Sequence, residues 1–220
     1  MPRKRVPFKR ESGKKSSRLV VIACEGTNTE PAYFQEYKRL FSKSGVRIEI
    51  LRREETASNP ERILSMLEEF QTTYSLAEDD ELWLVIDRDQ WEASEMASIA
   101  QQCTQNSLLN LAVSTPCFEL WLLLHRVDIA KYSEDKIAEL LLNKSHPKQD
   151  RTPLRKELYN IIGRFNHKNL TPHVEEDFLQ PEYIQSAIER SQTLDSNLKE
   201  RWIEGRLGTR VYLLVQSLQT

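Results

Sequence analysis

The chain has 220 residues, of which 39% are hydrophobic and 29% are charged, as is typical of a soluble globular protein with one or two domains. No apolar run approaches the roughly 18–20 residues that span a bilayer, and the N-terminus lacks the apolar stretch of a secretory signal. We therefore expect a cytoplasmic protein without membrane contact. Three widely spaced cysteines with no CxxC pair argue against a disulfide framework and against a zinc site.

The net charge of −2 is unevenly distributed along the chain. Residues 1–18 carry eight Lys/Arg and one acid, about +7, so the remaining residues carry about −9. This composition predicts a disordered basic tail over residues 1–17. The tail either aids solubility alone or neutralises nucleic-acid phosphates, and the sequence leaves both open. Its candidate nucleic-acid contacts are Arg3, Lys4, Arg5, Lys9 and Arg10.

Apolar runs alternate with helical patterns from the tail to about residue 128. Uninterrupted runs predict strands buried on both faces, and an alternating run predicts an edge strand. Strands are expected at 18–24, 46–51, 81–86 and 108–113. Helices are expected at 31–42, from 60 onward, at 93–103 and at 117–125. This order predicts a Rossmann-like α/β domain over 18–128, with about four mostly parallel strands.

After residue 128 the pattern becomes helical, and proline-containing polar loops separate the segments. Helices are expected at 134–143, 152–165, 181–200 and 209–219. The apolar run at 211–215 also fits a strand, so its type stays open. We predict that 129–220 forms a helical part packed on the sheet domain.

Acidic residues follow three of the predicted strands. Glu25 comes directly after the first strand, Asp87 and Asp89 follow the third, and Glu119 lies one turn into the helix after the fourth. In a parallel sheet the carboxyl ends of the strands form the ligand-binding edge. Side chains two apart in an extended segment point the same way. We therefore expect these four carboxylates to converge.

Converging carboxylates need a positive partner, because like charges about 4 Å apart repel by roughly 1 kcal/mol even in water. An all-oxygen set with open positions suits Mg²⁺ or Mn²⁺, which would polarise a phosphodiester and orient hydroxide. The alternative is that the acids are solvated or cap a helix. Glu30, beside Pro31, most simply complements a helix dipole, with metal ligation as the minor alternative.

Other phosphate chemistries fit the sequence less well. No GxxxxGK[ST] motif is present, which argues against a P-loop NTPase. A haloacid-dehalogenase-type phosphatase carries its DxD on the first strand, followed by a threonine two residues later. Here Glu25 ends the first strand, and Asp89 precedes Gln90 and Trp91. A DxD glycosyltransferase remains open, although it leaves Glu25 and Glu119 without a role.

The chain contains the stretches ACEGTNTEPAYF, LWLVIDRDQW, STPCFELWLLLH and GTRVYLLVQSL. In this order and spacing they resemble the RloB-like family of bacterial and archaeal proteins. The resemblance runs from about Arg18 to the C-terminus, and TPCFELWLLLH is the most distinctive part.

The resemblance implies a Toprim-like fold related to OLD-type nucleases. In that family pattern Glu25 matches a glutamate that binds metal and assists proton transfer, and Asp87 and Asp89 match a metal-binding DxD. The stretch from Ser114 to Glu119 is similar to an SxxxxE element whose glutamate holds a second metal. Lys168, in GRFNHKN, matches a lysine that would offset charge on phosphate.

The resemblance also implies a partner and a setting. It implies an Mg²⁺-dependent nuclease that acts in antiphage defence by abortive infection, often beside an ATPase called RloA, on DNA or on RNA such as tRNA. Arg88, between the two aspartates, would contact phosphate or form a salt bridge. The competing hypothesis is a non-catalytic nucleic-acid-binding or regulatory subunit of the ATPase complex. The sequence does not decide the oligomeric state, and a homo-oligomer stays open.

Overall fold

A computed structural model describes residues 17–42, 45–52, 59–89, 91–145 and 151–220. The five candidate nucleic-acid contacts of the basic tail lie outside the described residues. Residue ranges of the helices and strands below follow this structure.

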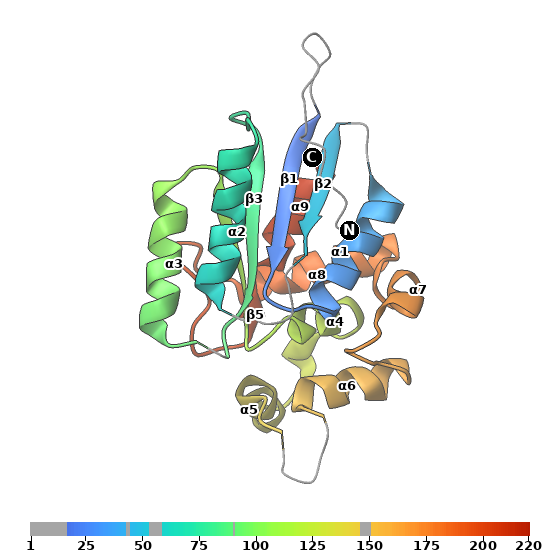
Figure 1. Cartoon of the computed structure of the whole chain (residues 1–220). Coiled ribbons are helices and arrows are strands. Elements are labelled where there is room, and N and C mark those ends of the chain that lie inside the picture. The colour runs from blue at the N-terminus through green and yellow to red at the C-terminus, as the bar shows by residue number, and fades with distance from the viewer. Residues whose placement is uncertain (1–16, 43–44, 53–58, 90, 146–150) are drawn as a thin grey trace.

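The described residues form a five-stranded sheet in the order β2-β1-β3-β4-β5 (Figure 1). Its strands are β1 (Arg18–Cys24), β2 (Val46–Leu51), β3 (Glu81–Asp87), β4 (Leu109–Thr115) and β5 (Gly208–Thr209). The first four strands are parallel, and β5 runs antiparallel to β4. The predicted α/β class with a mostly parallel sheet is confirmed.

Helices connect the strands and make up most of the C-terminal part. The α-helices are α1 (Thr29–Phe41), α2 (Pro60–Thr73), α3 (Ala93–Gln105), α4 (Glu119–Arg126), α5 (Glu134–Leu142), α6 (Pro153–Ile162), α7 (Val174–Phe178), α8 (Pro181–Leu194) and α9 (Val211–Gln219). Two short 3₁₀ helices are η1 (Ile129–Lys131) and η2 (Thr171–His173). None of the helices in the described part of the chain is long and apolar enough to cross a membrane.

The central strands are apolar on both faces because each face is covered by helices. In β1, Val20 and Ile22 belong to one hydrophobic cluster, whereas Val21 and Ala23 belong to the other. Helices α2 and α3 cover the second face, and α1, α4, α8 and α9 cover the first (Figure 1). The period of two in a strand therefore sends alternate residues into two separate cores.

The C-terminal part shares a core with the sheet. Residues of α8 and α9 join the same cluster as those of α1 and β1, and β5 extends the sheet beside β4. Helices α5 and α6 lie at the end toward which β1 and β2 point (Figure 1). Residues 211–215 are helical, which agrees with the expected helix at 209–219 and resolves the alternative that the sequence left open. The structure differs from the sequence prediction at α8, which ends at Leu194, and at the two-residue strand β5, which was not predicted.

Candidate active site

The parallel pairing brings three of the predicted acidic residues to one edge of the sheet. Cys24 pairs with Val85, and the Glu25 N–H donates to the Val85 carbonyl at 2.9 Å, so Glu25 lies just beyond the end of β1. Asp87 ends β3 and pairs with Ser114 on β4. Glu119 begins α4, four residues after β4 ends. The strand ends therefore place these carboxylates at the same edge, as parallel sheets generally do for ligand sites.

Two N–H donors hold the Glu25 carboxylate in place. The backbone N–H of Asp87 donates to Oε2 at 3.0 Å, and the Trp91 indole N–H donates to Oε1 at 3.0 Å. Glu25 is also buried, with 8% of its surface exposed. These bonds link the end of β1 to the end of β3 and satisfy the carboxylate that burial would otherwise penalise.

Asp87 serves the fold and the site together. Its Oδ1 accepts the Phe118 N–H at 2.8 Å and so caps the start of α4. One ligand atom each of Asp87, Cys117 and Glu119 lies within 4.8 Å of the others. Loss of solvation, and then the negative charges of Glu30 and Glu119, raise the pKa of Asp87 well above its ordinary value. Ionisation of Asp87 at this site therefore costs free energy in the folded protein.

Glu30 belongs to this acidic cluster, although the sequence favoured a role at the helix dipole. Its side chain is buried, and burial raises its pKa to about 7, with contributions from Glu119 and Glu25. Backbone N–H groups of Glu30 and Gly26 act in the opposite direction. A Cβ at Gly26 would lie 2.0 Å from Glu30 Oε2, so only glycine leaves room for this carboxyl. The Glu30 carboxyl thus accepts backbone N–H groups at the start of α1 and also lines the site.

These residues line an open pocket of about 520 Å³, which we call the acidic pocket. Its lining comprises Glu25, Gly26, Thr27, Asn28, Thr29, Glu30, Asp87, Trp91, Glu119, Arg155 and His167. Arg155, near the start of α6, donates from Nε to Glu119 Oε1 at 2.6 Å. This ion pair supplies positive charge within the lining.

The other predicted site residues within the described part of the chain do not line the acidic pocket. Asp89 is exposed and is not part of the acidic-pocket lining. Lys168 is exposed and lines a neighbouring pocket. Arg88 forms a two-bond ion pair with Glu204, at 2.8 and 2.7 Å, and also donates to the Trp91 carbonyl. The salt bridge that the sequence left as an alternative for Arg88 is therefore present.

The donor set fits a hard divalent cation. Carboxylates from Glu25, Glu30, Asp87 and Glu119 surround one open pocket, and oxygen ligands are those that Mg²⁺ and Mn²⁺ prefer. Burial raises the pKa of the Cys117 thiol well above its ordinary value, so this sulfur is a neutral neighbour. The pKa values of Asp87 and Glu30 are raised. A cation bound among these carboxylates would reduce their mutual repulsion and lower the pKa values.

Sequence reasoning missed Trp91, Arg155 and His167 of the acidic pocket and gave metal ligation by Glu30 only as the minor alternative. Trp91 and Glu30 lie beside predicted ligands in the sequence, so proximity to DRDQW and ACEG is the signal that could have found them. Arg155 and His167 lie 36 and 48 positions after Glu119, and no local pattern marks them. The Thr29 hydroxyl donates to the His167 carbonyl at 3.1 Å, which holds that loop against the start of α1.

Comparison with known proteins gives a family assignment. No curated protein and no solved structure shows a significant match to the chain. A family model described as "RloB-like protein" matches residues 20–218, nearly the whole length. Its range covers the acidic pocket and all the elements that build it. The chain therefore belongs to the RloB-like protein family.

Proposed function

We propose that the protein is an Mg²⁺- or Mn²⁺-dependent nuclease that hydrolyses phosphodiester bonds in DNA or RNA. The observation that carries this proposal is the meeting of carboxylates from three separate segments in one open pocket. Such a cluster is costly without a cation, and metal-assisted hydrolysis of phosphate esters is the chemistry that carboxylate-held divalent ions commonly perform.

In this proposal Glu25, Asp87 and Glu119 hold the metal, with Asp89 as a further proposed ligand. A bound divalent ion would polarise the phosphodiester and lower the pKa of an attacking water. The Asp87 and Trp91 N–H groups orient the Glu25 carboxylate, which is also the proposed general acid/base. Arg155, which now pairs with Glu119, can contact the phosphate as charge develops on it.

The biological setting is proposed from the family. We propose a Toprim-like nuclease that acts as the effector of an antiphage abortive-infection system, with an RloA-type ATPase as partner. tRNA is one proposed RNA substrate. The chain after the basic N-terminus carries about −9 and repels nucleic acid. We therefore propose that the basic N-terminus binds the phosphates of the substrate and holds it near the protein.

The test uses the full-length protein, alone and with the ATPase partner, on labelled DNA and RNA with and without Mg²⁺ or Mn²⁺. We expect cleavage that requires metal and that falls at least about 100-fold in Asp87→Ala and in Glu119→Gln, as for loss of a main catalytic group. Glu69→Gln, an exposed carboxylate on α2, is the matched control and should cleave like wild type. The nuclease proposal is wrong if no combination is cut or if Asp87→Ala cuts as well as wild type.

The Arg155–Glu119 ion pair favours a second candidate, a non-catalytic nucleic-acid-binding or regulatory subunit. In that case Arg155 stays paired with Glu119 and no metal is bound. Titration with Mn²⁺ separates the two. A nuclease binds Mn²⁺ and binds it more tightly in Arg155→Ala, because a competing cation is gone. An idle subunit binds no Mn²⁺, and Arg155→Ala lowers its stability.

A further inference from the structure

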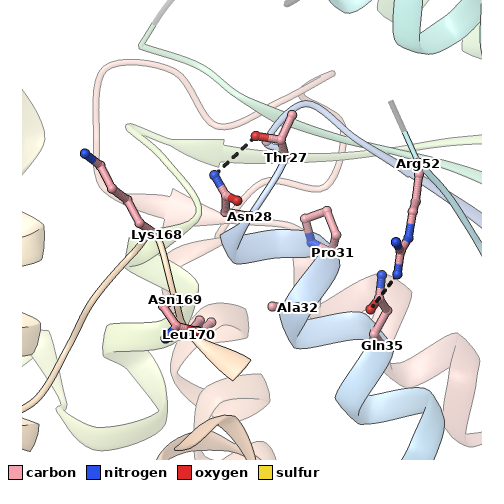
Figure 2. Close-up of a pocket in the computed structure, with 10 residues that line it drawn as sticks. Thr27, Asn28, Pro31, Ala32, Gln35, Arg52, Lys168, Asn169 and Leu170 are labelled. Carbon is pink, nitrogen blue, oxygen red and sulfur yellow. Dashed lines mark hydrogen bonds between the residues drawn. The ribbon is translucent and has the colours of Figure 1, made fainter. Parts of the chain in front are cut away.

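A second pocket, of about 250 Å³, adjoins the acidic pocket. The two share the segment Gly26–Asn28, so they meet at the turn after β1. The second pocket extends along the first turns of α1 and reaches the loop at Lys168 (Figure 2). Any ligand bound at the acidic pocket therefore has this hollow beside it.

Among the residues that the structure describes, the lining of the second pocket contains cations and amides and no carboxylate. Its residues are Gly26, Thr27, Asn28, Pro31, Ala32, Gln35, Arg52, Lys168, Asn169 and Leu170. The part of the chain that follows the basic N-terminus is acidic by about nine charges. The described lining of this pocket has no carboxylate, whereas four carboxylates line the pocket beside it, so the sign of the local charge changes between the two.

The polar groups of this pocket have few competing partners. Figure 2 shows Lys168 and Arg52 on opposite sides of the start of α1. Arg52 makes a 3.4 Å hydrogen bond to Gln35, and within the described residues neither cation forms an ion pair. Asn28 is the N-cap residue of α1, but its side chain makes no capping hydrogen bond; its amide donates instead to Thr27 Oγ1 at 3.3 Å (Figure 2). Cations and amide N–H groups are thus available to an anion.

The loop that carries Lys168 is held in place by its neighbours. The Thr29 hydroxyl donates to the His167 carbonyl at 3.1 Å, and Asn166 Oδ1 accepts the Lys168 N–H at 3.0 Å. Leu170, which follows, is buried. The Lys168 backbone is therefore anchored beside α1, while its long side chain stays free to reach a ligand.

We infer that this second pocket binds a phosphate of a nucleic-acid strand that flanks the phosphate at the acidic pocket, and we name it the flanking-phosphate pocket. Lys168 and Arg52 supply the charge, and the Asn28 and Gln35 amides supply hydrogen-bond donors. The inference rests on the proposed function, since it places the same substrate. It also makes Lys168 a positioning residue, distinct from Arg155, which lies among the carboxylates.

The physical reason is electrostatic. A carboxylate-lined pocket repels a polyanion, so a strand needs a cationic surface beside it to stay in place. Phosphates follow one another along a strand. When one phosphate lies at the acidic pocket, an adjacent phosphate can therefore bind in the cationic pocket beside it. Phosphate contacts of this kind set position and register without reading sequence.

The test measures binding of labelled DNA and RNA oligonucleotides to the full-length protein, with Ca²⁺ in place of Mg²⁺ to prevent cleavage. The variants are Lys168→Ala, Arg52→Ala and the double variant; the controls are Lys131→Ala and Arg62→Ala, both exposed cations elsewhere. We expect each site variant to weaken binding about 3- to 10-fold and to reduce the salt slope by about 0.7 per lost contact. Mn²⁺ affinity should stay at the wild-type value, because the metal is proposed to bind the other pocket.

The outcomes separate this inference from the proposed function. If the protein cleaves nothing yet the site variants still lose affinity and salt slope, the flanking-phosphate pocket stands and the nuclease proposal fails. If the site variants bind like the controls, or if wild type binds neither DNA nor RNA, the inference is overturned. In an active enzyme, Lys168→Ala should raise KM with little change in kcat. A fall in kcat alone would instead place Lys168 at the reacting phosphate and overturn the inference.

Discussion

At the scale of single residues, the site is a balance between negative charges and a few donors. The Asp87 backbone N–H and the Trp91 indole N–H stabilise Glu25, and Arg155 stabilises Glu119. Burial, and then the neighbouring carboxylates, raise the pKa values of Asp87 and Glu30. Sites that bury like charges together commonly trade folding stability for function.

Asp87→Asn should therefore stabilise the metal-free protein. The amide keeps an oxygen that can accept the Phe118 N–H but removes one charge from the cluster. We expect the metal-free Tm to rise by about 2–4 °C at pH 7.5, which corresponds to about 1 kcal/mol for a chain of this size. An acid whose pKa is raised in the folded state destabilises that state more as pH rises. The stability that Asp87→Asn gains over wild type should therefore disappear below pH 3.8, the ordinary pKa of aspartate, where Asp87 is protonated in both states.

The measurement is thermal unfolding with and without Mn²⁺. Wild type should gain stability from Mn²⁺, and Asp87→Asn should lose that gain. Asp128→Asn, at the surface cap of η1, serves as the control and should keep the Mn²⁺ effect. A lower metal-free Tm for Asp87→Asn would contradict the argument from charge crowding.

Gly26→Ala should act through Glu30. The added Cβ would lie 2.0 Å from the Glu30 carboxyl, and the backbone at Gly26 is not left-handed, so the effect is steric. We expect Gly26→Ala to destabilise wild type by about 1–3 kcal/mol, the usual range for overpacking a buried site. In a Glu30→Ala background the same change should cost less than about 0.5 kcal/mol. Denaturant unfolding of the four proteins gives the coupling, and additive costs would show that Gly26 acts independently of Glu30.

At the scale of elements, α4 connects the site to the core. Its first residue, Glu119, faces the acidic pocket, and the buried residues that follow pack against other helices. His125, near its end, donates from Nδ1 to the Trp121 carbonyl at 2.8 Å and accepts the Tyr33 hydroxyl at Nε2 at 3.1 Å. This pair joins α4 to α1, the two helices that carry Glu119 and Glu30. A neutral imidazole satisfies both bonds.

His125 should make stability depend on pH. Burial lowers its folded pKa from 6.5 to about 3. Between these values the unfolded chain binds the proton and the folded chain does not, so the contribution to stability is lost as pH falls below 6.5. Relative to His125→Asn, wild type should lose up to about 1.4 kcal/mol per pH unit from pH 6 to pH 5.

The comparison with His125→Asn is needed because Glu30 titrates in the same range with the opposite sign. Its folded pKa of about 7 makes its own contribution grow as pH falls. Urea unfolding of both proteins at each pH cancels that shared effect. His173→Gln, at an exposed position, should follow the wild-type profile. Parallel profiles for wild type and His125→Asn would show that His125 is not held neutral.

At the scale of the whole molecule, the C-terminal part completes the sheet beside the site. The Ser114 hydroxyl on β4 bonds the Thr209 hydroxyl on β5 at 2.8 Å, and the Arg210 N–H donates to the Val113 carbonyl at 2.9 Å. Arg210 also forms a buried two-bond ion pair with Asp195, at 2.9 and 3.1 Å. This pair ties the end of α8 to the start of α9, so the helical part and the sheet share one set of buried contacts.

Arg210→Ala should be strongly destabilising. It leaves the buried Asp195 carboxylate without its cation and frees the carbonyls of Asn197 and Glu200, which Arg210 also bonds. We expect a loss of about 3–5 kcal/mol in the free energy of unfolding, measured with denaturant. Arg206→Ala removes a partly exposed pair with Glu200 and should cost no more than about 1 kcal/mol.

A second variant distinguishes charge from packing at this position. Arg210→Met combined with Asp195→Leu removes both charges and keeps volume, so it should recover most of the stability that Arg210→Ala loses. Equal losses in the double variant and in Arg210→Ala would indicate that the helix–sheet junction depends on the ion pair itself.

The sequence by itself determined the parts that depend on local pattern. The strands at 18–24 and 46–51 match their predicted bounds, because hydrophobic period and run length are local properties. The positions of Glu25, Asp87 and Glu119 at one edge followed from parallel topology. The run at 211–215 was ambiguous because a fully buried helix and a buried strand are equally apolar, and packing of α9 against α8 and β4 decided it.

Only the tertiary structure decided which other groups face the acidic pocket. Arg155 and His167 reach Glu119 and Thr29 from 36 and 138 residues away, and no periodicity records contacts at that separation. The burial of Glu30 depends on the space that Gly26 leaves, and the separation of Lys168 from the carboxylates depends on where its loop meets α1. Local pattern determines where a chain extends or coils, whereas the surroundings of a side chain depend on elements that meet only when the core is packed.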